Sequence, residues 1–408
     1  MRRRLTARTG RRTGRRTALP VAFTSAAAVL LLACGSGGAP DGGSGKGAGD
    51  GDKDRSAAVV VRPGDDSARV PVGRKVTVRV RGGSLTSVEV TSPGPGRLAG
   101  TWSEDRSVWT ATTPLAPGAT YTVKARGRAS GGSPLERTAS FTTEAPRNTF
   151  VGEYVPDRGT TVGVAMPVSI TFDKPIRNKA AVERKLEVTA SPAVDGAWSW
   201  IKDRNGKDRV DYRPERFWKP GTEVTLRMNL AGVDAGGGVY GTQQRLVHFR
   251  IGDAVTSTLD VTRKTMTVAR NGRVLRALKV SSGKKGYETW NGTMVVLSKV
   301  PTIRMDSSTV RIFGHEAYDL GSVRWDVQLT PSGTYVHAAP WNEGKFGLTN
   351  GSHGCIGLST DDARWFYGQV SVGDPVTVVG STDTVAINNG YGDWNVDWAS
   401  WKRGGALR

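Results

Sequence analysis

Short runs that alternate hydrophobic and polar residues, separated by Gly and Pro, recur along residues 57–146. The clearest are Lys75–Gly83, Leu85–Ser92 and Ala119–Gly127. Because successive side chains of a strand point to opposite faces, this period of two indicates half-buried strands. Many short strands with turn signals between them are typical of a β-sandwich, so we predict one here.

Residues 147–252 repeat this pattern, most clearly at Pro167–Ile176 and Thr222–Leu230, and predict a second sandwich. Neither segment contains a cysteine, so hydrophobic packing alone must hold the sheets together. We find no cluster of acids, His or Cys in them that would support chemistry, and we interpret both as spacers or binding modules. Trp109 and Trp200 are expected in the cores rather than on a ligand-binding surface.

A third domain, residues 253–380, is predicted to be mostly β with one helix. Lys264–Gly283 is predicted as a hairpin because Asn271-Gly272 is a strong signal for a two-residue turn. Thr360–Gln369 is predicted as a helix whose first three residues can cap it. Further strands are expected at Val295–Val300, Arg324–Leu329, Gly333–His337 and Val376–Val379.

Residues 381–408 form a Trp-rich C-terminal extension. Trp394, Trp398 and Trp401 follow a spacing of four and three, which places them on one face of a helical turn. We expect these indoles and Tyr391 to pack the extension onto the third domain across a domain seam, rather than to bind a ligand.

Residues 1–33 have the layout of an export signal. Met1–Arg16 carries eight arginines and no acid, and the small, apolar run Ala18–Ala33 is shorter than the roughly 20 residues of a membrane span. Leu31–Cys34 resembles the lipobox of bacterial lipoproteins, which implies cleavage before Cys34 and lipidation of its thiol. An accidental Cys is the alternative, and twin-arginine and ordinary export both remain open. Residues 34–56 are a Gly-rich flexible linker.

The chain of 408 residues is too long for one ordinary domain. Its formal net charge of +20 falls to about +12 when the arginines of the signal are removed. No run of Lys and Arg is interleaved with aromatic residues as in a nucleic-acid groove, so we expect no nucleic-acid partner. Basic surfaces suit anionic polymers or lipid head groups, although an ordinary solvated surface is equally compatible with this charge.

The candidate chemistry is concentrated around Cys355, one of only two cysteines. His337 is followed, after fourteen residues, by Ser352-His353-Gly354-Cys355. A neighbouring imidazole can hold a thiol as the reactive thiolate, and a preceding Gly leaves room for a substrate. A buried structural cysteine is the alternative. If Cys34 is lipidated, Cys355 has no disulfide partner, and a lone thiol in an exported protein favours a nucleophile.

This pattern resembles the active-site signature of the bacterial L,D-transpeptidases, which is a His, a gap of similar length, Ser or Thr, His, Gly, Cys, a hydrophobic residue and Asn. The chain departs from the signature at Gly357, where many members carry Asn. Further similarity lies in Arg304–Ser308, Ser332–Trp341, Ala363–Tyr367 and Gly392–Trp398. The resemblance implies the actinobacterial type, with two immunoglobulin-like (Ig-like) domains, a mixed-β catalytic domain and a short C-terminal extension.

The resemblance also implies roles for residues near the nucleophile. His337 would be the general base, oriented by the backbone carbonyl of Ala338, so the side chain at position 338 should be replaceable. No Asp or Glu lies within five residues of His337 that could orient it instead. His353 would position or polarise the substrate, or it is a loop His bonded to backbone. The N–H groups of Gly354 and Cys355 are expected to stabilise an oxyanion.

Other family positions would line the grooves for the donor and acceptor peptides. Tyr318 would supply a phenol or backbone contact to the donor, and the absence of Asn at Gly357 puts a side-chain contact there in doubt. The remaining groove positions are Met305, Ser332, Gly333 and Trp341. His248 and His315 have no partner that the sequence identifies, so we expect them at the surface or in a core.

The implied reaction is a two-step acyl transfer on peptidoglycan. Cys355 would attack the carbonyl that joins the third residue of a tetrapeptide stem to its terminal D-Ala, which leaves a thioester. The side-chain amine of a second stem would then form a 3→3 cross-link, whereas water would give carboxypeptidase activity. Carbapenems should acylate Cys355. We further expect a monomer held to the membrane by its lipid anchor, outside the cell, without cofactor or metal.

Three other hypotheses are weaker. A papain-like peptidase lacks its local Cys signature here, and in this chain the His precedes the Cys. A catalytically inactive, wall-binding lipoprotein has Gly357 as its only sequence support. Four dispersed histidines without a His-Glu-x-x-His run give little support to a metal hydrolase. The identity of the diamino acid in the stem stays open.

Overall fold

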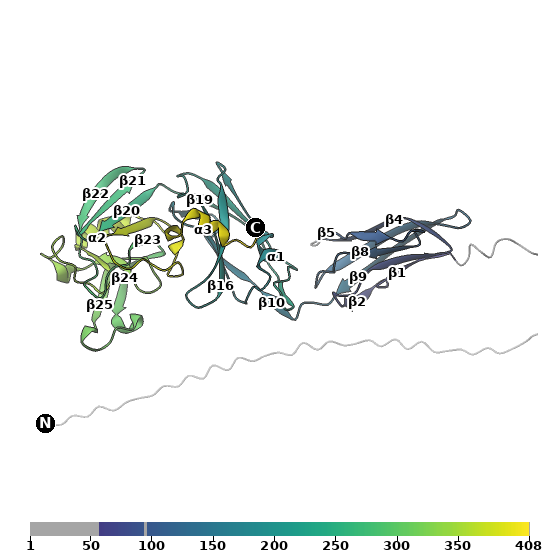
Figure 1. Ribbon diagram of the computed structural model, residues 1–408, viewed down its shortest axis with the longest axis horizontal. Coiled ribbons are helices and arrows are strands. Elements are labelled where there is room, and N and C mark those ends of the chain that lie inside the picture. The colour runs from purple at the N-terminus through teal and green to yellow at the C-terminus, as the bar shows by residue number, and fades with distance from the viewer. Residues whose placement is uncertain (1–56, 94–95, 408) are drawn as a thin grey trace, which may run out of the picture. The chain divides into compact units, whose positions relative to one another are not determined.

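Residues 57–93 and 96–407 are described by a computed structural model, and they fold mainly as β-structure (Figure 1). The expected signal peptide, the whole linker and Cys34 lie outside these residues. None of the helices in the described part of the chain is long and apolar enough to cross a membrane.

The first sandwich comprises β1 (Ala58–Arg62), β2 (Ser67–Val70), β3 (Thr77–Arg81), β4 (Gly83–Ser92), β5 (Gly96–Arg97), β6 (Gly100–Trp102), β7 (Val108–Ala111), β8 (Thr120–Ala129) and β9 (Pro134–Thr143). The strands form two sheets with the orders β1-β3-β7-β6 and β2-β9-β8-β4-β5. Buried side chains alternate with more exposed ones along β3 and β8, which confirms the predicted period of two. Trp109 is buried in this core, as expected.

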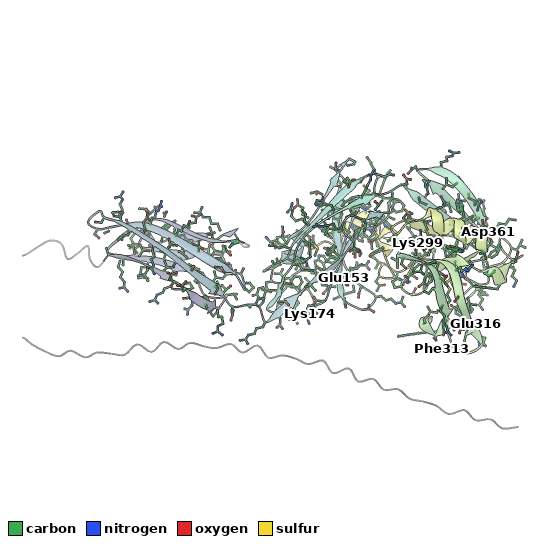
Figure 2. The ribbon with its side chains drawn as sticks, turned by 180° about the vertical axis from the view of Figure 1, so that it is seen from behind. Glu153, Lys174, Lys299, Phe313, Glu316 and Asp361 are labelled. Atoms are coloured by element: carbon green, nitrogen blue, oxygen red, sulfur yellow. The ribbon has the colours of Figure 1, made fainter. Side chains whose placement is uncertain are left out.

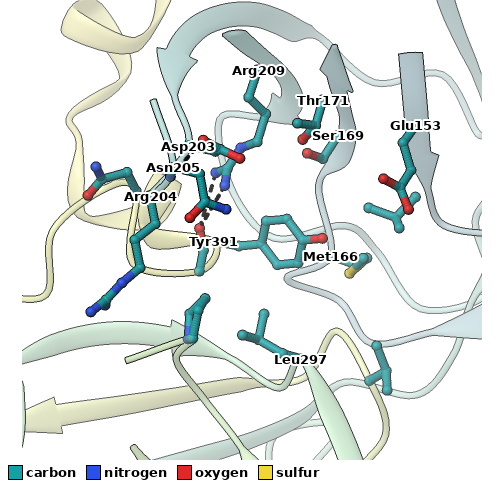
Figure 3. Close-up of a pocket in the computed structure, with 15 residues that line it drawn as sticks. Glu153, Met166, Ser169, Thr171, Asp203, Arg204, Asn205, Arg209, Leu297 and Tyr391 are labelled. Atoms are coloured by element: carbon teal, nitrogen blue, oxygen red, sulfur yellow. Dashed lines mark hydrogen bonds between the residues drawn. The ribbon is translucent and has the colours of Figure 1, made fainter. Parts of the chain in front are cut away.

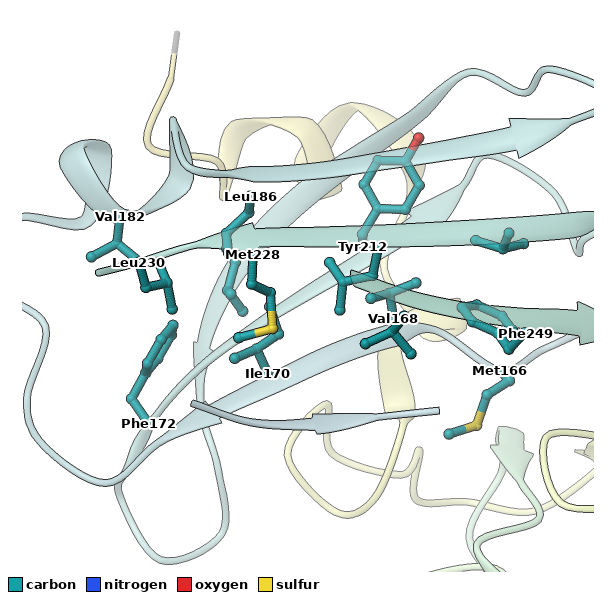
Figure 4. Packing of buried hydrophobic residues seen from close by; sticks show 14 of the residues in the cluster. Met166, Val168, Ile170, Phe172, Val182, Leu186, Tyr212, Met228, Leu230 and Phe249 are labelled. Carbon is teal, nitrogen blue, oxygen red and sulfur yellow. The ribbon is translucent and has the colours of Figure 1, made fainter. Parts of the chain in front are cut away.

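The second sandwich comprises β10 (Asn148–Phe150), β11 (Gly152–Val155), β12 (Thr161–Val162), β13 (Val168–Phe172), α1 (Lys179–Glu183), β14 (Leu186–Ser191), β15 (Gly196–Lys202), β16 (Asp208–Pro214), β17 (Glu223–Asn229), β18 (Val239–Gly241) and β19 (Gln244–Ile251). Two four-stranded sheets have the orders β11-β13-β16-β15 and β12-β19-β17-β14, and β10 pairs with β18. Ile170, Phe172 and Met228 meet in the core between them (Figure 4). Trp200 stacks on Phe172 with 5.6 Å between ring centroids, so it too is a core residue.

The third domain comprises β20 (Val255–Asp260), β21 (Thr265–Arg270), β22 (Arg273–Lys279), β23 (Gly292–Val295), β24 (Ser298–Asp306), the 3-10 turns η1 (Ser307–Val310) and η2 (Gly314–Glu316), β25 (Asp319–Gln328), β26 (Tyr335–Ala338), the 3-10 turn η3 (Pro340–Asn342), β27 (Ile356–Leu358), α2 (Thr360–Gln369) and β28 (Pro375–Val379). Its two sheets have the orders β22-β21-β20-β28-β23 and β24-β25-β26-β27. The predicted Asn271-Gly272 hairpin is confirmed, with both turn residues at positive φ.

Two details of the predicted elements were wrong. The strand expected at Val295–Val300 is interrupted, because the chain passes there from one sheet to the other. The N–H of Val296 bonds to Asp374 O beside the first sheet, whereas that of Leu297 bonds to Gln328 O in the second. Helix α2 has the predicted bounds, but its N-cap is Ser359, whose side chain accepts from the N–H of Asp362.

The C-terminal extension does not form one helical turn. Trp394 lies in η4 (Gly392–Asn395), and extended backbone at Val396 separates it from α3 (Trp398–Arg403). The extension was expected to pack on the third domain, yet α3 packs against β15 of the second sandwich, while η4 lies against β23. Arg213 of the second sandwich attracts the aromatic rings of the extension to that domain. Its guanidinium carbon lies 4.9, 5.4 and 4.5 Å from the ring centroids of Trp394, Trp398 and Trp401.

Candidate active site

The site lies on one face of the second sheet of the third domain. Strands β26 and β27 run parallel, with Val336 opposite Ile356 and His337 opposite Gly357. Val336 and Ile356 are buried in the core, so alternation turns His337 and Gly357 to the opposite face. That face borders a cavity of about 160 Å³, which is lined by Met305, Tyr318, Leu320, His337, Ala339, Trp341, Asn342, Gly351, Ser352, His353, Cys355 and Gly357.

His337 is buried at the end of β26, and only one of its ring nitrogens remains available. Its Nδ1 lies 2.8 Å from the carbonyl oxygen of Ala338, the contact that the family resemblance implies. A carbonyl only accepts, so Nδ1 carries the hydrogen, and in the neutral ring Nε2 has the lone pair. Burial lowers the pKa of His337, which keeps the ring neutral and makes Nε2 a competent base.

The surroundings of Cys355 favour the protonated thiol. Burial raises the pKa of its thiol to about 11, against the opposing effect of the Tyr335 N–H, and the carboxylate of Asp326 raises it further. The Sγ atom lies 3.4 Å from the carbonyl oxygen of Gly333, to which the thiol donates. These shifts favour a neutral thiol and a neutral imidazole in the empty site, and the expectation that an imidazole holds the thiolate stays a prediction.

The loop before Cys355 is fixed by hydroxyl groups. Gly354 has φ +113°, which favours glycine, and its carbonyl accepts from Thr289 Oγ1 at 3.0 Å. Ser352 Oγ accepts from the N–H of Gly354 at 3.1 Å and donates to the carbonyl of Cys355 at 2.6 Å. The N–H of Gly354 is thus engaged in this conformation, and its expected oxyanion role stays a prediction. The N–H of Cys355 has no acceptor among the described residues.

His353 is held by a carboxylate rather than by backbone. Its Nε2 lies 2.6 Å from Glu316, and the Lys284 ammonium lies 2.5 Å from the same oxygen. Lys284 and then His353 hold the pKa of Glu316 at about 2. The rings of Tyr287 and Tyr318 flank the imidazole, with centroids 4.7 and 5.1 Å away. Figure 2 shows Glu316 in the segment that connects β24 to β25.

Most of the expected groove residues do line the cavity. Met305, Tyr318, Trp341 and Gly357 border it, and the Trp341 ring lies 5.8 Å from that of His337. Burial, followed by the neighbouring Cys355, raises the pKa of Tyr318 to about 12, so its phenol stays protonated.

Ser332 and Gly333, the other two expected groove residues, are not among the residues that line the cavity. Ser332 does not line the cavity, because its Oγ accepts from Asn389 Nδ2 of the extension at 2.8 Å. Gly333 lies beside the thiol at φ +102°, where a Cβ would collide with Val310.

The two other histidines lie outside the site. His248 hydrogen-bonds to Thr225 on the exposed surface of the second sandwich, at 2.8 Å, and His315 is almost fully exposed. Both positions agree with the expectation of a surface or core residue.

The sequence did not reveal Asp326. Val327 faces the core, so Asp326 faces the side of the sheet that carries the site, and it is completely buried there. Neither of its carboxylate oxygens makes a hydrogen bond of normal geometry in the described part of the chain, and the backbone N–H of Ile303 only opposes the effect of burial on its pKa. Burial raises the pKa of Asp326 to about 7. A charged residue within a short alternating strand was the only sequence signal for it.

A larger cavity, about 590 Å³, lies elsewhere and lacks the candidate catalytic groups (Figure 3). Its lining includes Arg209 and Tyr391. Arg209 donates to the carbonyl of Gly390 at 3.1 Å and pairs with Asp211 at 2.7 Å, so it already ties the extension to the second sandwich. Residues 57–93 and 96–407 contain no group of three or more His, Cys, Asp or Glu that could hold a metal ion.

The chain is similar to families and proteins that are already known. Residues 255–378 match the family described as L,D-transpeptidase catalytic domain, and residues 67–234 match the family described as bacterial Ig domain. L,D-transpeptidase 2 of Mycobacterium tuberculosis is 38% identical over 345 residues, which cover 84% of this chain and 83% of that protein. L,D-transpeptidase 5 of the same organism is 35% identical over 350 residues, covering 85% and 76%.

Among solved structures, an L,D-transpeptidase in complex with imipenem is 36% identical and covers 57% of this chain and 100% of its own, with a TM-score of 0.49. A thiol and a base-competent imidazole on the same sheet face define a cysteine acyl-transfer site. The chain belongs to the L,D-transpeptidase family, and its fold is the expected one, mainly β with an Ig-like region before the catalytic domain.

Proposed function

We propose that this protein forms 3→3 cross-links in peptidoglycan through a thioester on Cys355. The observation that carries the proposal is the placement of the Cys355 thiol and the His337 imidazole on one sheet face, bordering one cavity. The names of the relatives support the same reaction class.

In the first step, His337 Nε2 takes the thiol proton as Sγ attacks the carbonyl before the terminal D-Ala of a tetrapeptide stem. The N–H of Cys355 stabilises the resulting oxyanion, since it has no acceptor of its own. The C–N bond then breaks, the amine of D-Ala takes the proton from His337, and a thioester remains. Because the resting thiol is neutral, proton transfer has to accompany the attack.

In the second step, the side-chain amine of another stem attacks the thioester and the thiol is restored. Water as acceptor would instead release a tripeptide stem, which is the carboxypeptidase alternative. His353, oriented by Glu316, lies at the cavity where it would contact the donor peptide. A β-lactam carbonyl presents a similar target to Sγ, and a family member has been solved with imipenem.

The remaining parts of the chain fit an enzyme of the cell envelope. Lipidation at Cys34 would anchor it to the outer face of the membrane, and residues 57–146 and 147–252 would act as Ig-like spacers. The catalytic domain would occupy residues 253–380, and we expect a monomer. Radiolabelled palmitate should enter the parent and not Cys34→Ala; labelling of neither would refute the anchor.

The first test is the intact mass of the exported chain after incubation with meropenem, with Cys355→Ala as the control. We expect an adduct on the parent only, because only the thiol can open the lactam. Purified tetrapeptide stems should then give a cross-linked dimer and free D-Ala. A folded parent without adduct or product would favour the inactive, wall-binding alternative. D-Ala release without dimer would favour the carboxypeptidase.

A further inference from the structure

Position 357 is tightly enclosed in this protein. A Cβ there would lie 3.0 Å from Ala339 Cβ and 3.3 Å from the carbonyl oxygen of Ser281. Both distances are tighter than ordinary van der Waals contact. The Ser281 carbonyl cannot easily withdraw, because it accepts from the N–H of Gly357 at 2.8 Å while the Ser281 N–H donates to the Gly357 carbonyl at 3.0 Å. The Asn that many family members carry here would therefore require Ala339 or the Ser281 carbonyl to shift.

The amide of Asn342 occupies the neighbouring volume. Its Nδ2 lies 3.8 Å from the position that a Gly357 Cβ would take, and both residues border the cavity of Cys355. The backbone of Asn342 is fixed in η3, where its N–H bonds to Ala339 O at 2.9 Å. Its side-chain amide has no hydrogen-bond partner in the described part of the chain. A half-buried amide without a partner at a catalytic cavity is available for a ligand.

We infer that Asn342 supplies the side-chain amide that other members carry at position 357, and that it binds the backbone of the donor peptide beside the scissile bond. A primary amide donates and accepts, so it can pair with both the N–H and the C=O of a peptide unit. Asn342 is thus a specificity residue of the transpeptidase. It provides from η3 the amide group that other members carry at the position of Gly357 in β27. This inference rests on the proposed function of Cys355.

The first measurement is kcat/KM for a tetrapeptide donor in Asn342→Ala, beside its exposed neighbour Glu343→Ala. We expect Asn342→Ala to lose between about threefold and tenfold, the effect of one hydrogen bond, and Glu343→Ala to match the parent. The rate of Cys355 alkylation by iodoacetamide should be unchanged in both, because that reagent has no peptide backbone. An unchanged kcat/KM, or an equal loss in alkylation, would overturn the inference.

The second measurement tests whether positions 342 and 357 share one volume. Gly357→Asn should lower kcat/KM more in the parent than in the Asn342→Ala background, since the crowding against Ala339 and Ser281 is the same in both. Equal losses in the two backgrounds would contradict the shared volume. If the parent itself does not turn over the donor, the proposed function fails together with this inference. A parent that is active alongside a fully active Asn342→Ala refutes the inference alone.

Discussion

At the residue scale, burial and the Glu316 carboxylate determine which groups of the site are charged. Burial lowers the pKa of His337 and raises those of Cys355 and Asp326 to about 11 and about 7. His337 and Cys355 thus favour their neutral forms near neutral pH, whereas Asp326 changes its charge in that range. Charge enters through Glu316, which stays ionised because it contacts Lys284 and His353.

Glu316→Gln should lower kcat/KM for donor acylation roughly tenfold, because the neutral amide weakens a charge-assisted hydrogen bond that orients His353. Steady-state kinetics with a tetrapeptide donor measure this. Lys284→Met is the matched control, since it removes the other partner of Glu316 and leaves the contact with His353 intact. An equal loss of kcat/KM in both variants, or a loss that a lower melting temperature explains, would argue against the orientation of His353 by Glu316.

Asp326→Asn should speed alkylation of Cys355 severalfold at pH 8 and leave it unchanged at pH 5.5. The carboxylate raises the pKa of the thiol only when it is ionised, which occurs above about pH 7. Rates with iodoacetamide across this range test the prediction. If the ratio of the alkylation rates of variant and parent does not change with pH, the Asp326 carboxylate does not raise the pKa of the Cys355 thiol.

The same carboxyl predicts how stability depends on pH. The pKa of Asp326 in the folded state, about 7, lies above the unfolded value, so the folded state retains the proton longer. The parent should therefore lose stability relative to Asp326→Asn between about pH 4 and pH 7, by on the order of 2 kcal/mol, with no further change above. Denaturant titrations of both proteins at pH 4, 6 and 8 measure the difference, and a constant difference would contradict it.

At the element scale, predictions succeeded where the signal is local. The helix Thr360–Gln369 has its predicted bounds because its cap and its first-turn acids lie within a few residues. The hairpin at Asn271-Gly272 depends on two adjacent residues with positive φ. The segment from η1 to η2 has no local sequence pattern of this kind. Its shape depends on Ser307, whose Oγ donates to Ile312 O and accepts from the Tyr318 N–H.

The pairing of β26 with β27 shows where element-level prediction ends. A strand was expected up to His337 and a loop at Cys355, and both are present. The parallel register that aligns His337 with Gly357 is a contact between segments about twenty residues apart, and no local pattern specifies it. That register places the thiol and the imidazole on one face.

At the scale of the whole molecule, the extension links the catalytic domain to the second sandwich. Trp401 is fully buried and donates to Ala197 O at 2.9 Å, while Trp394 donates to Ala165 O at 2.8 Å. Glu183 of the sandwich accepts from the N–H of Ala406 at 2.7 Å. On the other side, Asn395 bonds to both backbone groups of Thr293 in β23.

Deletion after Gly380 should lower the melting temperature, because it exposes the surface around Arg213 and removes these bonds. Differential scanning calorimetry of the exported chain and its truncation tests this, and equal melting temperatures would refute it. Trp401→Ala should reproduce part of the loss, about 3 kcal/mol, whereas the exposed neighbour Lys402→Ala should not.

The sequence by itself determined the mainly β architecture, the helix, and the pair of His337 and Cys355, because each is encoded in local period, capping or motif spacing. Only the tertiary structure decided what surrounds that pair. Glu316 reaches His353 across 37 residues, Asp326 faces the site through the strand register, and Asn342 fills the space beside Gly357. Such contacts follow from sheet register and loop packing, which join distant parts of the chain and leave no local pattern in it.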